Sequence, residues 1–412
     1  MPCLRFSWEF KEQGLLITLQ NNMRRILMVV PWYLPGYKGG GPIRTLENMV
    51  EWLGDDFQLY IVTSDRDLGD CQPYLGVKPG IWQPVGKAQV RYLTPKEMTV
   101  PVLYRLFRTV DYDLMYLNSF FSPLTVKIMF LRRIGAIPER PVVLAPRGEF
   151  SLGALVLKRL KKRLYIFLAK RLGLYANITW QASSEYEKKD ILSIIGKDCI
   201  SEKPPIKVAP NLPPKGRGKI IVENRPKQAG SARIVFLSRI ARKKNLDAAL
   251  RFLKKVNGKV QFDIYGPIED KLYWQECEAL IHKLPKSVQV RYKGEADPEQ
   301  AVNIFSHYHL FLFPTRGENF GHVILEALHG GCLIMTSDQT PWRNLAKKMA
   351  GWDIPLSEPD QFYASLNDLL SMDDCVFEQW SKSARDCANK FSQNPDLVVA
   401  SRELFSEAFL RN

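Results

Sequence analysis

The sequence predicts two consecutive α/β domains, each built on a mostly parallel sheet with helices on both faces. Short, fully apolar runs such as 26–30 and 310–313 are typical of strands buried on both faces of a parallel sheet. These runs alternate with segments of helical periodicity, and a proline-rich stretch separates two such series. The length of 412 residues fits two or three domains of ordinary size.

The first series of elements is expected to form a domain over 23–205. It opens with a strand, a glycine-containing loop and a helix, which is how a βαβ unit begins. The apolar run at 15–19 is too short for a signal peptide. Residues 1–22 are expected to be a dispensable extension, with Met23 as an alternative start, because two arginines and a clean strand follow Met23 at once. The expected strands are 26–30, 58–63, 114–117 and 142–145, and the expected helices include 43–53, 123–134 and 152–172.

A linker is expected at 206–231, because prolines and basic residues crowd this part of the chain. Strand–helix alternation resumes over 232–390, the expected C-terminal domain. The last segment, 391–412, is expected to be a helix that could cross back to the N-terminal domain. The expected strands of the second domain are 233–237, 261–265, 288–292, 310–313 and 332–335, and its expected helices are 245–256, 298–306 and 321–329.

The net charge of +15 favours a polyanionic partner, which could be nucleic acid, an anionic membrane or a phosphate-bearing substrate. Charge alone does not choose among these three classes. Seven cysteines lie far apart without a Cys-x-x-Cys pair, which indicates free thiols in a reducing compartment such as the cytoplasm. No stretch of the sequence approaches the roughly 18 apolar residues of a spanning helix.

The sharpest motif runs from Pro314 to Gly321, between an apolar strand and a helix. The peptide N–H groups of Asn319, Phe320 and Gly321 are expected at the N-terminus of that helix. Free amides and the positive end of the helix dipole together form a phosphate site.

Two glutamates, Glu318 and Glu326, belong to the same motif and are eight positions apart. On a continuous helix this spacing corresponds to about 12 Å. Carboxylates that share acid–base work on one glycosidic bond stand closer, about 5–9.5 Å apart. The pair is therefore expected to hold the two ends of a long ligand, a sugar and a ribose with diphosphate between them. The alternative is that one glutamate caps the helix and the other is a solvated charge.

A second motif, 237–247, again lies between a strand and a helix. Its cations Arg239 and Lys244 are placed where they could clamp a leaving diphosphate, and fixed positive charge is a strong catalytic factor in such a transfer. A basic loop that faces water is the alternative. A third motif has Gly40 and Gly41 after the first strand, where a backbone without side chains can approach a ligand or simply make a tight turn. It is not the Gly-x-Gly-x-x-Gly pattern of dinucleotide binders.

These motifs together resemble glycosyltransferase family 4, a retaining family with the GT-B fold of two Rossmann-like domains facing a cleft. The resemblance covers the chain from Met23 onward and is most specific in the Glu-x7-Glu element with its Phe-Gly pair. It implies that Glu318 holds donor-sugar hydroxyls and Glu326 the ribose, while Arg239 and Lys244 neutralise the diphosphate. It further implies a UDP- or GDP-linked donor, retained stereochemistry, and no metal or other cofactor.

The resemblance also assigns residues outside the Glu-x7-Glu element. Gly266, at a strand end, would lie near the nucleotide, and Arg147 and Glu149 would lie in a loop lining the cleft on the acceptor side. Many relatives have a histidine where this chain has Arg147, and another where it has Gln181, so the role of Arg147 stays open. The implied acceptor is a lipid-linked glycan, as in bacterial surface-polysaccharide synthesis.

The expected helix 152–172 carries a basic cluster at 158–163 beside an apolar stripe. Such a helix can lie on the anionic inner face of a plasma membrane, with each Lys or Arg contributing about 1 kcal/mol. In the alternative, the stripe packs on the domain core and the cations face water. The stripe consists of Leu152, Val156, Leu160, Leu164, Leu168 and Leu172.

Rival interpretations remain at this point. A basic nucleic-acid or membrane binder without catalysis explains the charge, but the sequence lacks nucleic-acid recognition motifs, so no nucleic-acid partner is expected. Another GT-B-like enzyme, an epimerase or a phosphorylase, is a second alternative. The pair Asp111 and Asp113 imitates a metal motif but is expected to end a turn. His322 and His329 share a helix face with Glu326, yet a third close zinc ligand is not identified.

Overall fold

The computed structural model describes residues 23–156, 159–196, 205–216 and 225–410. The expected extension at 1–22 lies outside these residues. The chain forms two compact units, one from residues 1–150, 158–215 and 395–412, the other from 151–157 and 216–394. Both units are α/β with mainly parallel sheets, which confirms the predicted fold class. In the described part of the chain, no helix is long and apolar enough to cross a membrane.

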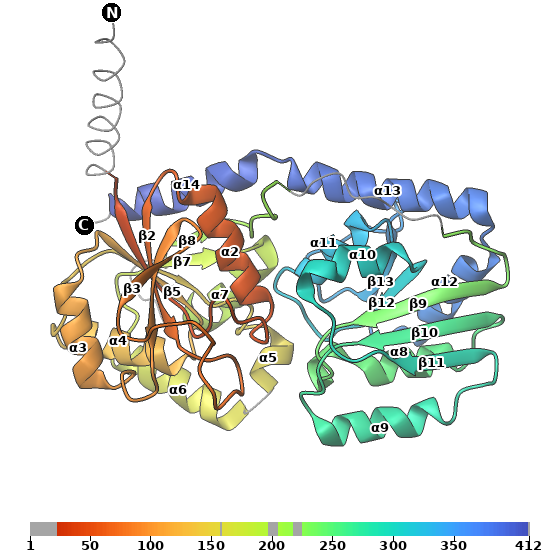
Figure 1. Ribbon diagram of the computed structural model, residues 1–412, viewed down its shortest axis with the longest axis horizontal. Helices are drawn as coiled ribbons and strands as arrows, with labels where there is room; N and C mark the ends of the chain where they lie inside the picture. Colours follow the sequence, from red (N-terminus) through yellow and green to blue (C-terminus); the bar gives the residue numbers. More distant parts are fainter. Residues whose placement is uncertain (1–22, 157–158, 197–204, 217–224, 411–412) are drawn as a thin grey trace, which may run out of the picture. The chain divides into compact units, whose positions relative to one another are not determined.

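The first unit contains an eight-stranded sheet in the order β3-β4-β2-β1-β5-β6-β7-β8, with only β3 antiparallel to its neighbour (Figure 1). Strand β1 lies between β2 and β5, so the winding of the chain reverses there. Ligands of such sheets bind outside the carboxyl ends of the strands at this reversal. The strands are β1 (Arg25–Val29), β2 (Gln58–Ser64), β3 (Trp82–Val85), β4 (Ala88–Leu93), β5 (Leu114–Asn118), β6 (Val142–Ala145), β7 (Thr179–Ala182) and β8 (Ile206–Val208).

Six described helices accompany this sheet. The last of them comes from the C-terminus of the chain and packs against α2, β6 and β8, where Phe405 makes edge-to-face ring contacts with Phe57 and Tyr116. The helices are α2 (Gly41–Leu53), α3 (Val100–Thr109), α4 (Pro123–Arg133), α6 (Arg159–Arg171), α7 (Glu185–Ile195) and α14 (Asp396–Phe409).

The second unit contains a fully parallel six-stranded sheet in the order β11-β10-β9-β12-β13-β14. Here β9 lies between β10 and β12, so the winding reverses between β9 and β12. The strands are β9 (Ser231–Leu237), β10 (Lys259–Tyr265), β11 (Val288–Tyr292), β12 (Leu310–Phe313), β13 (Leu333–Ser337) and β14 (Gly351–Ile354). The helices are α5 (Leu152–Val156), α8 (Leu246–Leu253), α9 (Lys271–Ile281), α10 (Ala301–Ser306), α11 (His322–His329), α12 (Pro359–Ser371) and α13 (Asp374–Ser392), with short 3-10 turns η2 (Arg242–Lys244) and η3 (Pro298–Gln300).

The apolar runs of the sequence form the central strands of both sheets. All residues of β5, β6, β12 and β13 are buried, as expected for strands covered by helices on both faces. The expected helix over 152–172 corresponds to α5 and α6, which fall in different units. Residues 157–158, which separate them, lie outside the described residues.

The apolar stripe of that predicted helix does not pack on a core. Leu160, Leu164 and Leu168 are 83%, 60% and 45% exposed, and Ala169 is the one residue of α6 that is buried. The alternative in which the stripe packs on the domain core is therefore wrong for these leucines. A helix that turns its leucines to the surface needs another apolar environment to cover them.

Candidate active site

Two loops meet at the carboxyl ends of β9 and β12 in the second unit, where the winding of its sheet reverses. The N–H of Arg316 donates to the carbonyl of Lys243 at 2.9 Å. Asn245, in the left-handed conformation with φ 63°, donates from Nδ2 to the carbonyl of Pro314 at 2.8 Å and accepts from Nε of Arg316 at 3.1 Å. The two loops are thus held together by one backbone hydrogen bond and two that involve the Asn245 side chain.

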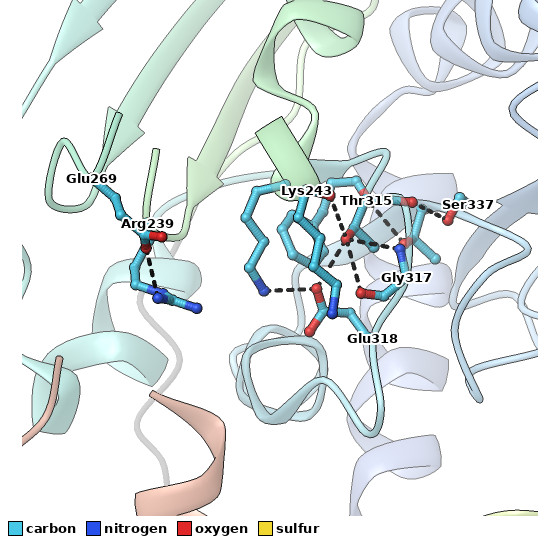
Figure 2. Close-up of polar contacts among 10 residues, drawn as sticks. Arg239, Lys243, Glu269, Thr315, Gly317, Glu318 and Ser337 are labelled. Carbon is cyan, nitrogen blue, oxygen red and sulfur yellow. Dashed lines mark hydrogen bonds and ion pairs between the residues drawn. The ribbon is translucent and has the colours of Figure 1, made fainter. Parts of the chain in front are cut away.

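An ion pair joins the two loops, between Lys244 and Glu318. Nζ of Lys244 lies 2.7 Å from Oε1 of Glu318, and the two side chains are only 14% and 12% exposed. The hydroxyl of Thr315 reaches the same Oε1 at 2.9 Å, as Figure 2 shows. The ammonium also lies 5.4 Å from the centre of the Phe313 ring, within cation–π range. The sequence predicted both charged residues as site residues but not their direct contact.

Charge keeps Glu318 ionised in spite of its burial. Desolvation alone would raise the pKa of this carboxyl, but the charges of Lys244 and Lys243, with the hydrogen bonds from Lys244 and Thr315, lower the pKa below its usual value. A carboxylate that stays ionised accepts hydrogen bonds and does not act as an acid. Among the described residues none donates to Oε2 of Glu318, so this oxygen is available to a hydroxyl group.

The neighbouring strand β13 fixes the backbone on either side of Glu318. Oγ of Ser337 donates to the carbonyl of Thr315 at 2.5 Å, and the N–H of Glu318 donates to the carbonyl of Gln339 at 3.0 Å. Between them Gly317 adopts φ 148°, a conformation that side chains rarely allow. The carboxylate is therefore presented on a rigid loop, which is what an electrostatic site requires.

Helix α11 begins directly after this loop. Gly321 caps it with φ 79°, and among the described residues no acceptor pairs with the N–H of Phe320 or of Gly321. The ring of Phe320 packs on Trp342 and Phe391, so only its peptide group can face a ligand. Asn319 precedes the cap, and Glu326 is half-buried within α11. This helix start offers donors and a positive dipole end to an anion.

Arg239 stands apart from the Lys244–Glu318 pair. Its Nη1 lies 2.6 Å from Oε2 of Glu269, and both side chains are partly exposed. Figure 2 shows this pair to one side of Glu318 and Thr315. The structure therefore does not place Arg239 in the same contact cluster as Glu318. Its partner Glu269 belongs to none of the motifs found in the sequence, and no signal there marks it.

Gly266 is required by packing between two strand ends. With φ 133°, a Cβ at this position would lie 2.0 Å from the carbonyl oxygen of Ser238. Its N–H donates to the carbonyl of Gly294, and its carbonyl accepts from the hydroxyl of Tyr292. This glycine lets β9 and β10 end side by side, a structural role that accounts for it without a ligand.

The first unit holds the other predicted residues. Gly40 has φ 71° and precedes α2, which begins at Gly41, and no atom lies within 4 Å of a Cβ built on Gly40. The carboxylate of Glu149 accepts from the hydroxyl of Ser119 at 2.6 Å and from the N–H groups of Phe120 and Phe121 at 2.6 and 3.1 Å. Burial raises the pKa of Glu149, and these hydrogen bonds oppose the rise. Glu149 therefore holds the loop after β5.

Arg147 follows β6 with φ 56°, and its guanidinium donates to Tyr116, Asn118 and Asn211. The sequence placed Arg147 and Glu149 in one loop, but the contacts of the two side chains are separate. Of the residues that sequence reasoning missed, Asn245 carried a usable signal, because asparagine is enriched in the left-handed conformation and precedes a helical run here.

The residues that imitate metal sites have other partners. Arg25 of β1 forms ion pairs with both Asp111 and Asp113, which ties the start of β5 to β1. Nε2 of His329 lies 3.0 Å from Oγ of Ser392. Across residues 23–156, 159–196, 205–216 and 225–410, no three His, Cys, Asp or Glu side chains gather in a way that could hold a metal ion.

Comparison with known proteins points to one kind of enzyme. Residues 219–389 match the family model described as glycosyl transferases group 1. No curated protein sequence matches the chain. The fold is similar to sucrose-phosphate synthase from Thermosynechococcus elongatus, with a TM-score of 0.68 at 13% identity over 94% of this chain and 100% of that one.

Two further solved structures are similar to the chain. One is Anabaena Alr3699/HepE in complex with UDP and glucose, with a TM-score of 0.65 at 15% identity over 93% and 100% of the two chains. The other is WaaG, a glycosyltransferase involved in lipopolysaccharide biosynthesis, with a TM-score of 0.63 at 13% identity over 92% and 98%. All three likenesses concern the fold.

Proposed function

We propose that the chain, a glycosyltransferase with the GT-B fold, transfers a sugar with retained stereochemistry and without a metal from a UDP- or GDP-linked donor to a lipid-linked glycan. The observation that carries this proposal is the half-buried Lys244–Glu318 ion pair directly before the start of α11. It combines a cation, a hydrogen-bond acceptor and a helix N-terminus within one rigid loop pair. A donor molecule presents the matching groups, a diphosphate and sugar hydroxyls.

In the proposed reaction, the bond from the anomeric carbon to the diphosphate oxygen breaks as the acceptor oxygen attacks the same carbon from the same face. The acceptor proton passes to the departing phosphate oxygen, so no protein base is needed. Lys244 has N–H groups beyond the one that Glu318 uses, and these would stabilise the negative charge on the phosphate together with the amides of Phe320 and Gly321. Oε2 of Glu318 would accept a hydroxyl of the donor sugar.

The other predicted donor contacts remain part of the proposal. Arg239 would exchange Glu269 for the diphosphate, which is feasible because exposed ion pairs are weak. Glu326 would hold the ribose. The free thiols described for Cys71, Cys277, Cys332, Cys375 and Cys387 support a reducing compartment, and we propose the cytoplasmic face of a membrane as the site of action.

Donor hydrolysis tests the enzyme function without knowledge of the acceptor. The full chain is incubated with labelled UDP-glucose or GDP-mannose in the presence of EDTA, and release of free sugar and retention of its anomeric configuration are followed. We expect binding and slow hydrolysis of one donor. If neither donor binds at millimolar concentration while DNA or anionic vesicles do, the chain is a binding protein and the proposal fails. Loss of activity in EDTA would refute only the proposed metal independence.

Helix α6 supports the proposed membrane contact. Leu160, Leu164, Phe167 and Leu168 are all exposed, and they lie on one face of the helix. Cations alternate with them along the helix, at positions 159, 161, 163 and 171, and the side chains of all four are exposed as well. Exposed leucines flanked by cations match the boundary between lipid headgroups and acyl chains. A lipid-linked acceptor would be reached from this surface.

We expect the full chain to sediment with vesicles that contain phosphatidylglycerol and not with phosphatidylcholine vesicles. The double variant L164E/L168E should lower this binding at least tenfold, because it places two negative charges on the apolar face. The matched control is L272E, since Leu272 of α9 is 69% exposed but has no such cluster around it. Equal vesicle binding by L164E/L168E and the parent chain would refute the contact through α6.

A further inference from the structure

A cation that forms no ion pair with the described residues lies at the carboxyl ends of the strands in the first unit. Arg147 follows β6, next to the end of β5, close to the point where the winding of this sheet reverses. The backbone there is strained, because Ser119 and Arg147 have φ values of 77° and 56° although neither is glycine. Such strain is concentrated at functional sites when the surrounding structure enforces it. Open α/β sheets bind their ligands at such positions.

Among the described residues, every hydrogen bond of the Arg147 guanidinium goes to a neutral group. Nε donates to Oδ1 of Asn118 at 2.9 Å, Nη1 to Oδ1 of Asn211 at 2.7 Å and Nη2 to the hydroxyl of Tyr116 at 2.5 Å. Within the described ranges, no carboxylate oxygen lies within 4 Å of its nitrogens. A half-buried arginine is normally paired with an anion. Here the positive charge is held in place and left uncompensated.

A hydrogen-bond chain fixes the direction of the guanidinium. The hydroxyl of Tyr116 donates to Oε1 of Gln181 at 2.5 Å, which leaves its oxygen free to accept from Arg147. Nε2 of Gln181 in turn donates to the carbonyl of Ala209 at 2.9 Å, so the amide cannot flip. The chain links the ends of β5, β7 and β8. Such a support keeps a binding group in one orientation before the ligand arrives.

The nearby acidic residues, Glu149 in this loop and Glu187 on α7, bind backbone N–H groups instead of the arginine. Glu149 accepts from Phe120, Phe121 and Ser119, as described above. The carboxylate of Glu187 accepts from the N–H of Gly148 at 2.6 Å and from Ser183 at 2.7 Å. Neither carboxylate forms an ion pair with Arg147, although Gly148 and Glu149 follow it directly in the chain.

A second, independent observation comes from Asn118. Its Oδ1 accepts from Arg147, but its Nδ2 is buried and has no hydrogen-bond partner among the residues that the structure describes. The residue is only 2% exposed. Buried amide groups are almost always paired in native proteins, so an oxygen from outside the chain is expected to satisfy this donor. The missing partner is an acceptor, and it lies beside an uncompensated cation.

We propose that Arg147 and Asn118 form a subsite for an anionic oxygen group, a phosphate or a carboxylate, on the acceptor. This inference rests on the proposed function, which supplies the acceptor as the ligand. The donor diphosphate is not assigned to Arg147, because the second unit has its own cations and helix start for it. It narrows the substrate class to acceptors that carry a negative charge near the attacking hydroxyl. Gln181 and Tyr116 act as positioning residues for Arg147.

Binding can be measured at Arg147 itself, without turnover. The full chain is labelled with ¹⁵N-arginine, and the Nε–H signal of Arg147 is identified by its absence in R147K and in R147Q. Inorganic phosphate and methyl β-glucuronide are then titrated separately, and the stronger response shows which anion the subsite prefers. The internal control is Arg291, which already holds Asp263 through Nε at 2.8 Å and should not respond.

We expect a saturable shift of the Arg147 signal by at least one of the two probes, and at least tenfold weaker binding in N118A. The shift should persist in K244M, which removes the main cation of the second unit. No saturable shift up to about 50 mM of either probe, or equal responses of Arg147 and Arg291, would overturn the subsite. Anion binding at Arg147 in a chain that hydrolyses no donor would preserve the subsite and refute the proposed transfer reaction.

Discussion

Replacing Lys244 with methionine is expected to lower the rate of sugar transfer by about 10²- to 10³-fold, the range found when one fixed donor to a developing charge is removed. The ammonium is half-buried between Glu318 and the Phe313 ring, so no solvent cation can take its place. The loss should appear in kcat more than in KM, because the charge on the phosphate grows only as the bond breaks. Steady-state kinetics with the identified donor would check both parameters.

Replacing Lys244 should also change the pH dependence of the activity. Desolvation raises the pKa of Glu318, and the charges of Lys244 and Lys243 are what lower it. In K244M the carboxyl should therefore take up a proton at higher pH than in the parent chain, and the remaining activity should fall on the acid side at that higher pH. E318Q should remove this acid limb, since it cannot ionise.

Two comparisons make the assignment falsifiable. Arg242 lies on the same short turn as Lys244 but pairs with exposed Glu276, so R242A should change activity less than threefold. Because Lys244 and Glu318 are in contact, the losses in K244M and E318Q should not add in the double variant. Full transfer activity in K244M, or strictly additive losses, would contradict a shared role of the two residues.

The fold could be predicted largely because its central strands are buried on both faces. The run 26–30 became β1 and the run 310–313 became β12, since a continuous apolar segment has few other structures to adopt. The hairpin of β3 and β4 was missed. Strand β3 has only four residues, none of them buried, and contains Pro84, so neither apolar alternation nor strand propensity marks it.

The site was predictable in its residues but not in its contacts. A strand followed by a helix marks a phosphate-binding loop, and this located both Lys244 and Glu318. Their pairing depends on β9 and β12 being neighbours, although 74 residues separate the two side chains in the sequence. Glu269 shows most clearly the limit of predicting contacts from the sequence. It contacts Arg239 from the loop after β10, and nothing in its local sequence distinguishes it.

The neutral surroundings of Arg147 could not be predicted for the same reason. Tyr116 and Asn118 come from β5, Gln181 from β7 and Asn211 from the loop after β8, and only the sheet order brings them to one edge. The role of Arg147 was open because many relatives have a histidine at this position. The absence of a carboxylate partner among the described residues, which the sequence does not show, is the observation that points to an anion-binding role.

A buried arginine within the expected linker 206–231 anchors the second unit. Arg225 is 2% exposed, and its Nη1 and Nη2 donate to carbonyls at the ends of α10 and α11 and to Oγ of Ser381 on α13. These carbonyls belong to helix C-termini, where the negative end of the dipole favours a cation. The carbonyls that accept are those of Phe305, Ser306, Tyr308, Gly330 and Gly331.

We expect R225M to lower the free energy of unfolding of the second unit by about 3 kcal/mol or more, because several buried acceptors lose their donor at once. Desolvation lowers the pKa of this guanidinium to about 10, so the burial is costly, and the carbonyls and Oγ of Ser381 offset it. Urea unfolding followed by tryptophan fluorescence would measure the change, and Trp352 and Trp380 stack within this unit.

Arg385 provides the matched control, since it also donates to Oγ of Ser381, at 2.7 Å, but is partly exposed. R385M should cost less than about 1 kcal/mol, as is usual for partly exposed polar contacts. If R225M is as stable as the parent chain, other donors satisfy the carbonyls and Arg225 does not stabilise the second unit. A loss in R225M with unchanged stability in R385M would show that the buried arginine, and not the shared serine, holds the linker to the second unit.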